Sequence, residues 1–261
     1  LTRSVARVAA ALAVAALVVF LAVVLALRYV VFPQIDDYRE EIAASVSRAS
    51  GMAVSVDDVD AGWHGLRPLL ALTGVRVSDR QGKVVFELER AEFSLSWWSL
   101  LAGDLRFRDV DFFSPQLRLY RGVDGLIYLA DKPLNGPAAG EDDAFTAWLL
   151  AQPRFAIHDA TLDWRDELAG APEVELRQVE IAIRKEGQRH RIAVEAQPPA
   201  AIADRVAARA DLRFERAGRA WTAAGTIYAE AFQADLERLR AHVPVPEALR
   251  TARGQVRAWI D

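Results

Sequence analysis

The chain has 261 residues, of which 52% are hydrophobic and 26% are charged. Its 36 acidic and 32 basic side chains give a formal net charge of −4, which argues against a general nucleic-acid partner. The aromatic content (7 Trp, 5 Tyr and 11 Phe) is too high for an intrinsically disordered chain. The absence of Cys excludes a disulfide framework, a thiol nucleophile, and a Cys-ligated zinc or iron–sulfur centre.

A continuous apolar segment lies close to the N-terminus. Val8–Leu27 is a run of 20 residues drawn only from Ala, Val, Leu and Phe. As a helix this run is roughly 30 Å long, which matches the hydrocarbon core of a bilayer. It exceeds the apolar region of a cleaved signal peptide, and Leu25-Ala26-Leu27, directly before Arg28, is not an A-x-A cleavage site. The sequence therefore favours an uncleaved transmembrane anchor over a signal peptide.

Charged residues on either side of this anchor predict its orientation. Arg3 and Arg7 precede the apolar run, whereas Asp36 and Asp37 follow it. The positive-inside rule then places the short N-terminus in the cytoplasm. We expect a single-pass protein of the bacterial inner membrane, with the bulk of the chain in the periplasm.

The segment after the anchor predicts an amphipathic helix. Pro33 suits the first turn of a helix, and Gly51 is a common left-handed terminator. Between them, apolar residues recur at spacings of three and four from Ile35 to Ala49, which forms one stripe. We expect this stripe to pack over the structure that follows.

Beyond Gly51 the apolar residues alternate with polar ones, which predicts β-strands. We expect a mainly β fold with a single N-terminal transmembrane helix. The strands would form an elongated, curved antiparallel sheet with a few short helices, expected at Ala144–Ala151, Ala200–Arg205 and Ala231–Ala241. The expected domains are the N-terminus and anchor (1–32), an amphipathic helix (33–51), a first β segment (52–131), a loop or hinge with a short helix (132–152), and a second β segment (153–261).

One face of this sheet is expected to be apolar. Around Gly74 the alternation places Leu70 and Leu72 on one side of a strand, and Val75 and Val77 on the other. Such a face either packs against the protein's own elements or stays open as a groove for acyl chains, and the small number of helices favours the groove. The candidate groove residues are Val75, Val77, Phe93, Leu95, Leu105, Phe107, Leu117, Leu119, Ile181, Ile183, Ile192 and Val194.

The sequence offers little for catalysis. The four histidines are scattered, and no nucleophile elbow, phosphate-binding loop or paired metal-ligand motif occurs. His158 and Asp159 are sequence neighbours, but adjacent strand residues point to opposite faces. The acidic run Asp57–Gly62 lacks the spacing of a calcium loop and is better explained as a turn. We therefore expect no catalytic residues, no metal site and no cofactor.

Several short segments, in a fixed order, carry a family resemblance. They are the anchor Val8–Leu27, the helix Pro33–Gly51, Met52–Val56, Trp63–Pro68, Thr73–Val77, Trp97–Leu101, Phe107–Tyr120, Phe155–Trp164, Gln197–Pro199 and Ala208–Phe214. Together they resemble the AsmA-like family, in particular its large YhdP-type members. The resemblance implies a bridge-like lipid transfer protein with an inner-membrane anchor and a long β-groove across the periplasm. It also implies that this chain is the N-terminal portion of a longer protein, and it carries over no catalytic residue set.

Two functions follow from these observations. The first is a non-catalytic lipid transfer protein whose apolar groove conducts phospholipid from the inner towards the outer membrane. Its partners would be phospholipid acyl chains, the inner membrane and an envelope protein at the distal end. The alternative is a scaffolding module for outer-membrane biogenesis that binds proteins, for instance by strand addition at an open sheet edge.

Overall fold

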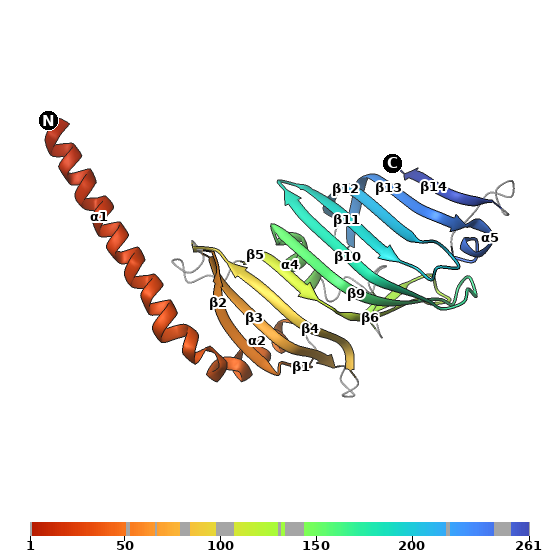
Figure 1. The fold of residues 1–261 in the computed structure, drawn as a ribbon, viewed down its shortest axis with the longest axis horizontal. Helices are drawn as coiled ribbons and strands as arrows, with labels where there is room; N and C mark the ends of the chain where they lie inside the picture. Colours follow the sequence, from red (N-terminus) through yellow and green to blue (C-terminus); the bar gives the residue numbers. More distant parts are fainter. Residues whose placement is uncertain are drawn as a thin grey trace.

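The computed structural model describes residues 2–50, 53–65, 67–78, 84–97, 107–129, 132–133, 144–217, 220–242 and 252–260. Its described strands join into one large mixed sheet, accompanied by a few short helices (Figure 1). The prediction of a mainly β fold with one long N-terminal apolar helix is confirmed. That helix projects away from the sheet, and the C-terminus lies near the opposite end of the sheet (Figure 1).

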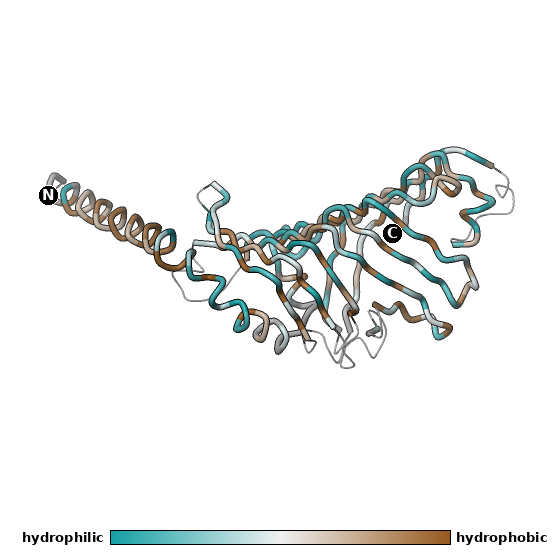
Figure 2. Tube along the Cα trace, turned by 60° about the horizontal axis from the view of Figure 1, so that its bottom comes forward, coloured by the Kyte–Doolittle hydropathy of each residue, from teal (hydrophilic) through white to brown (hydrophobic). Residues whose placement is uncertain are grey.

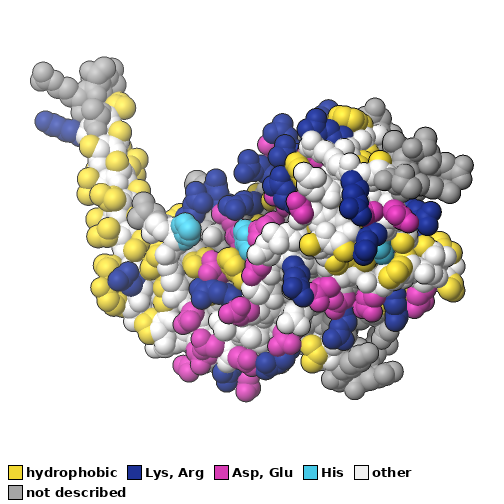
Figure 3. Space-filling view, turned by 45° about the vertical axis from the view of Figure 1, so that its right-hand side comes forward, with side chains coloured by type: hydrophobic (Ala, Val, Ile, Leu, Met, Phe, Trp, Pro, Cys, Tyr) yellow, Lys and Arg dark blue, Asp and Glu magenta, His cyan; other side chains and the backbone are white. Residues whose placement is uncertain are grey.

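The N-terminal helical region changes character along its length. Helix α1 spans Thr2–Ala26, continues through a π-helical turn at Leu27–Val31 and a 3-10 segment at Phe32–Tyr38, and leads into α2 at Arg39–Ser50. The stretch from Arg7 to Ala44 contains an apolar helix long enough to cross a membrane, and none of the residues in its most apolar window is buried. Most of α1 is hydrophobic by residue type (Figure 2), and its large apolar side chains, such as Leu12 and Leu17, are exposed. The space-filling view shows hydrophobic side chains on the surface of this helix (Figure 3).

The strands follow in chain order, with the short helix α4 at Ala144–Ala151 between β8 and β9, as predicted. The strands are β1 Ala53–Ser55, β2 Asp58–His64, β3 Arg67–Ser78, β4 Val84–Leu95, β5 Phe107–Phe113, β6 Gln116–Arg121, β7 Ile127–Leu129, β8 Lys132–Pro133, β9 Arg154–Asp166, β10 Val174–Glu186, β11 Arg189–Gln197, β12 Arg205–Ala217, β13 Ala220–Asp235 and β14 Arg253–Ile260. Their main order in space is β2, β3, β4, β5, β9, β10, β11, β12, β13 and β14, with β6 to β8 continuing alongside β9 (Figure 1).

One set of pairings departs from the expected antiparallel sheet. Strand β9 runs parallel to β5 over 109–113 and to β6 over 116–121, while the remaining described pairings are antiparallel. Because α4 connects β8 to β9, the chain returns to the edge where β5 begins and then runs in the same direction. A local alternation pattern does not contain this connection, so the sequence did not predict it.

Residues in the left-handed backbone region interrupt several strands. Gly74 has φ +62°, and the non-glycine residues Ser114, Asp159 and Gln178 have φ values of 50°, 51° and 47°. The register shifts on both sides of Val179 in the β9–β10 pair, as expected for β-bulges. Bulges bend a strand and increase its twist, and Figure 2 shows the sheet as a bent, twisted surface.

The C-terminal helix is shorter than expected. Residues 231, 232, 234 and 235 pair with β12 or β14 within β13, and only Leu236–Leu239 forms a helix, α5. Asp235 ends the strand and accepts hydrogen bonds from the backbone N–H groups of Glu237 and Arg238, which caps α5. The helix expected at Ala200–Arg205 is wrong as well, because this segment is a turn that leads into β12. Strand pairing therefore overrides the helical propensity at the start of the segment 231–241.

Candidate functional site

A row of apolar residues crosses the sheet perpendicular to its strands. Directly paired positions contribute one residue from each of β2 to β5 and β9 to β13, and paired positions face the same side of a sheet. This first apolar row consists of Ala61, Leu70, Phe93, Val110, Phe155, Ile183, Ile192, Ala210 and Ile227.

A second row runs beside the first, two residues away along each strand. Side chains two residues apart in a strand point the same way, so the two rows form one surface. We call this surface the apolar face. The second apolar row consists of Val59, Leu72, Ala91, Phe112, Ile157, Ile181, Val194, Ala208, Ala229 and Ala258.

Helices cover the part of the apolar face nearest to α1. Ile42 and Ala43 of α2 pack against the buried cluster that contains Val59 and Leu72. Helix α4 lies over the same face further along, where the backbone oxygen of its Leu150 is 2.9 Å from Nε2 of His190 on β11. In Figure 1 both helices lie behind the sheet. The covered end of the face is thus part of the hydrophobic core.

From β10 to β13 the residues of the two apolar rows are only half-buried. Val110 and Phe155 have 0% and 5% of their surface exposed, whereas Ile181, Ile183 and Ile192 are of intermediate burial. Apolar side chains on this stretch are shielded by their neighbours in the sheet but not enclosed. The face therefore changes from a closed core to a partly open surface along the strand order.

Phenylalanine rings connect three neighbouring strands on this face. Phe93 on β4 lies 5.0 Å from Phe107 and 6.3 Å from Phe112, both on β5, measured between ring centroids. Phe112 in turn contacts Phe155 on β9 edge-to-face at 5.2 Å. Such ring pairs add about 0.5–1.5 kcal/mol each beyond the area that they bury. These contacts hold β4, β5 and β9 together and so stabilise the parallel pairing of β5 with β9.

The residues predicted for the groove do not all lie on the apolar face. Ile181, Ile183, Ile192, Val194 and Phe93 lie in the two apolar rows. Leu95 and Phe107 pair with each other at a register shift, and Leu117 and Leu119 of β6 pair with Leu162 and Trp164 of β9. Val75 and Val77 are buried, and Leu105 lies outside the described residues.

The expected separation of Leu72 from Val75 across strand β3 is wrong. Both side chains belong to the same buried cluster beneath α2. Gly74 lies between them with a positive φ, so the alternation changes phase at this position. A lone glycine within a strand pattern is the sequence signal for such a bulge. Sequence reasoning also missed Val110. Its place in the first apolar row becomes evident only from its pairing with Phe93 and Phe155.

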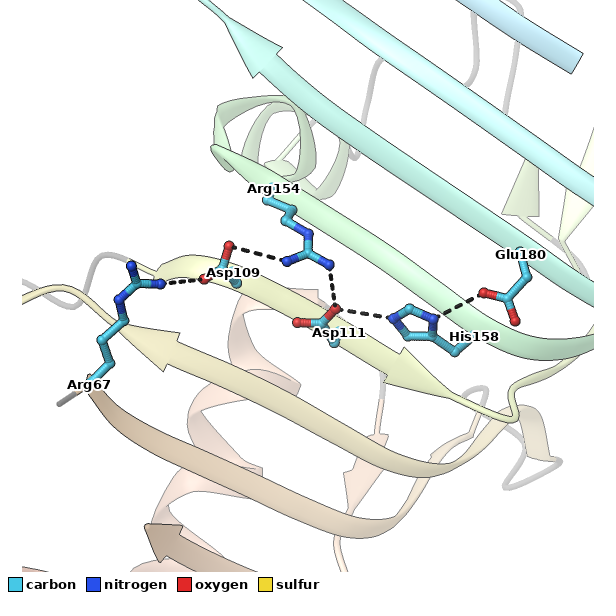
Figure 4. Close-up of polar contacts among 6 residues, drawn as sticks. All are labelled: Arg67, Asp109, Asp111, Arg154, His158 and Glu180. Carbon is cyan, nitrogen blue, oxygen red and sulfur yellow. Dashed lines mark hydrogen bonds and ion pairs between the residues drawn. The ribbon is translucent and has the colours of Figure 1, made fainter. Parts of the chain in front are cut away.

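The opposite face of the sheet is polar. Arg67, Asp109, Arg154, Asp111, His158 and Glu180 form a chain of contacts across β3, β5, β9 and β10 (Figure 4). The five successive distances are 3.6, 4.0, 3.8, 3.2 and 3.0 Å. Figure 3 shows acidic and basic side chains interspersed over the surface seen in that view. This polar face is suited to solvent.

His158 contacts two carboxylates from other strands rather than its sequence neighbour. Its Nε2 lies 3.2 Å from Asp111 and its Nδ1 3.0 Å from Glu180, while its ring stacks on Phe113. The described part of the chain holds no group of three His, Asp or Glu side chains arranged to bind a metal ion. The contacts tie β5, β9 and β10 together on the polar face, which is a structural role.

A buried ion pair fixes the parallel pairing of β6 with β9. Asp166 is 2% exposed and forms a two-point ion pair with the Arg121 guanidinium, while the backbone N–H of Ala169 donates to the same carboxylate at 2.9 Å. Burial alone would raise the pKa of Asp166, but the hydrogen bonds from Arg121 and Ala169 outweigh it and lower the pKa. Asp166 is therefore ionised in the folded protein at neutral pH.

These features define a class of protein: an N-terminal apolar helix followed by a long sheet with one apolar and one polar face. The sequence model of the YhdP protein family matches residues 1–261, and the chain belongs to this family. A relative from Escherichia coli (strain K12), named intermembrane phospholipid transporter YhdP, is 32% identical over 105 residues. That match covers 40% of this chain but only 8% of the relative's length.

Proposed function

We propose that this chain is the membrane-anchored proximal part of a lipid transfer protein, and that its apolar face conducts phospholipid from the inner towards the outer membrane. The observation that carries the proposal is the pair of apolar rows, which continue over successive strands from β2 to β13. Membership of the YhdP family supports a lipid cargo, as does the similarity to the Escherichia coli intermembrane phospholipid transporter.

The physical basis is hydrophobic transfer without a headgroup site. Each methylene removed from water contributes about 0.8 kcal/mol, so an acyl chain lying along the rows is held by contact area alone. Small residues such as Ala208 and Ala210 alternate with larger ones along the lane, and none of the row positions carries a charge. An acyl chain can therefore shift from one strand to the next without breaking a specific hydrogen bond.

Helix α1 supplies the anchor in this proposal. Its apolar side chains are exposed, with Leu12 66% and Leu17 61% accessible, as suits contact with lipid. Arg3 and Arg7 on one side and Asp36 and Asp37 on the other favour a cytoplasmic N-terminus and a periplasmic sheet.

The test is capture of lipid on the half-buried part of the apolar face. A photo-crosslinking amino acid at Ile183 should capture phospholipid in cells. The same group at neighbouring Arg184, which is exposed on the polar face, is the matched control. The proposal fails if both positions capture equally little lipid while the protein is folded and membrane-bound. Capture of an envelope protein through the outer edge of β14, which pairs with no further strand in the described part of the chain, would favour the scaffolding function if Ile183 captures no lipid.

A further inference from the structure

Four aromatic rings join α1 to the ends of the first strands. Phe20 of α1 lies 4.9 Å from Trp97, which follows β4, and Trp97 lies 5.8 Å from Trp63 near the end of β2. Trp63 also contacts Phe32, the first residue of the 3-10 segment, at 5.2 Å. We call these four residues the aromatic junction.

The position of Phe20 within α1 sets the height of this junction. Phe20 lies seven residues before Leu27, the last residue of the apolar run. At 1.5 Å per residue, its ring is about 10 Å inside the apolar segment. Because Trp97 touches Phe20, the residue that follows β4 lies beside the membrane-spanning segment. Trp63, at the end of β2, touches Phe32, five residues after Leu27, and so lies near the end of the apolar run.

The aromatic junction is continuous with the apolar face. Trp63 is two residues from Ala61 of the first apolar row, so it continues the apolar side of β2. Its ring contacts that of Trp97, which lies two residues beyond the end of β4.

We propose that the end of β2 and the residue that follows β4 enter the outer leaflet of the membrane that α1 crosses, and that phospholipid acyl chains pass over the contacting Trp63 and Trp97 rings onto the apolar face. The occupant is bilayer phospholipid, because Trp97 lies beside the membrane-spanning segment and Trp63 near its end, at the interface where tryptophan is enriched. The lipid-uptake half of this inference rests on the proposed function, whereas the insertion of the strand ends does not.

Strand β2 provides a matched pair of positions for measuring depth. His64 and Asp58 are both exposed, lie on the same side of β2, and mark its two ends. Six residues of extended chain separate them by about 20 Å. Since the protein has no cysteine, His64→Cys and Asp58→Cys can each carry one environment-sensitive fluorophore.

The labelled chains are reconstituted into phosphatidylethanolamine–phosphatidylglycerol vesicles that contain a phospholipid with a nitroxide on an upper acyl carbon. We expect several-fold stronger quenching and blue-shifted emission at position 64 compared with position 58. Phe20→Ala combined with Trp97→Ala should reduce quenching at position 64 and leave position 58 unchanged. Equal quenching at both positions in the unaltered junction would overturn the insertion of the strand ends.

The two proposals fail in different ways. Lipid captured at Ile183 without selective quenching at position 64 would overturn this inference and leave the proposed function standing. Selective quenching at position 64 without lipid at Ile183 would support insertion of the strand ends and overturn lipid passage together with the proposed function.

Discussion

A single charge placed in the first apolar row should interrupt the lipid lane. Ile192 is half-buried on β11 and pairs with Ile183 on one side and Ala210 on the other. Neighbouring strands are about 4.8 Å apart, a distance spanned by about four methylenes of an extended acyl chain. At about 0.8 kcal/mol per methylene, losing these contacts costs about 3 kcal/mol. As a barrier, that cost corresponds to about a hundredfold slower passage of lipid past β11.

The assay places the crosslinking group on either side of the altered strand. With Ile192→Asp, the initial rate of phospholipid capture at Ile227 on β13 should fall by about a hundredfold, whereas capture at Phe107 on β5 should persist. Ala193→Asp is the matched control, because Ala193 is adjacent in sequence and pairs with Arg209 on the polar face. Circular dichroism checks that both variants fold. Undiminished capture at Ile227 in Ile192→Asp, or an equal loss in Ala193→Asp, would refute the reasoning.

Three further predictions concern stability, each measured by thermal or urea unfolding. Asp166→Asn should destabilise the protein by about 3 kcal/mol at neutral pH, because it leaves Arg121 without its buried partner. Since folding lowers the pKa of Asp166 from its ordinary 3.8, this difference should be complete above that pH and shrink below it; a pH-independent difference would contradict the assignment. Gly74→Ala should cost about 1–3 kcal/mol, because φ is +62° and a Cβ there would overlap the Asp57 side chain; an unchanged midpoint would show that the strand relaxes. Gln178→Gly should instead stabilise by about 0.5 kcal/mol, since Gln178 is exposed at φ 47°, and a lower midpoint would contradict this expectation.

The alternation of apolar and polar residues correctly predicts which side chains share a face wherever two strands pair as a regular hairpin. Ile181 and Ile183 pair with Val194 and Ile192 without interruption, so the period of two in each strand predicts which side chains share a face. The long apolar helix was equally predictable, because its length and composition do not depend on tertiary contacts. These are the parts of the fold whose cause is local.

The remainder depends on contacts that a local pattern does not contain. The helix expected over Ala231–Ala241 has an apolar stripe, but residues 231 and 232 complete the pairing with β12 and the strand prevails. The phase change at Gly74 and the parallel course of β9 are likewise set by neighbouring strands. Without the register, neither Val110 nor Phe155 could be assigned to a row that crosses the sheet.

The one-residue-per-strand construction of the apolar rows limits how such a protein can change in length. Deleting or inserting a single residue within a paired strand reverses every side chain beyond it, so a charge would enter each row at that strand. Only length changes that keep the alternation of the strand in phase leave the rows intact. Such changes are the insertion of two residues, an extra residue accommodated as a bulge, or the addition of a complete hairpin. Length variation among proteins built on this plan should therefore occur in units of whole hairpins or in the loops between strands, and seldom as single-residue gaps inside a strand.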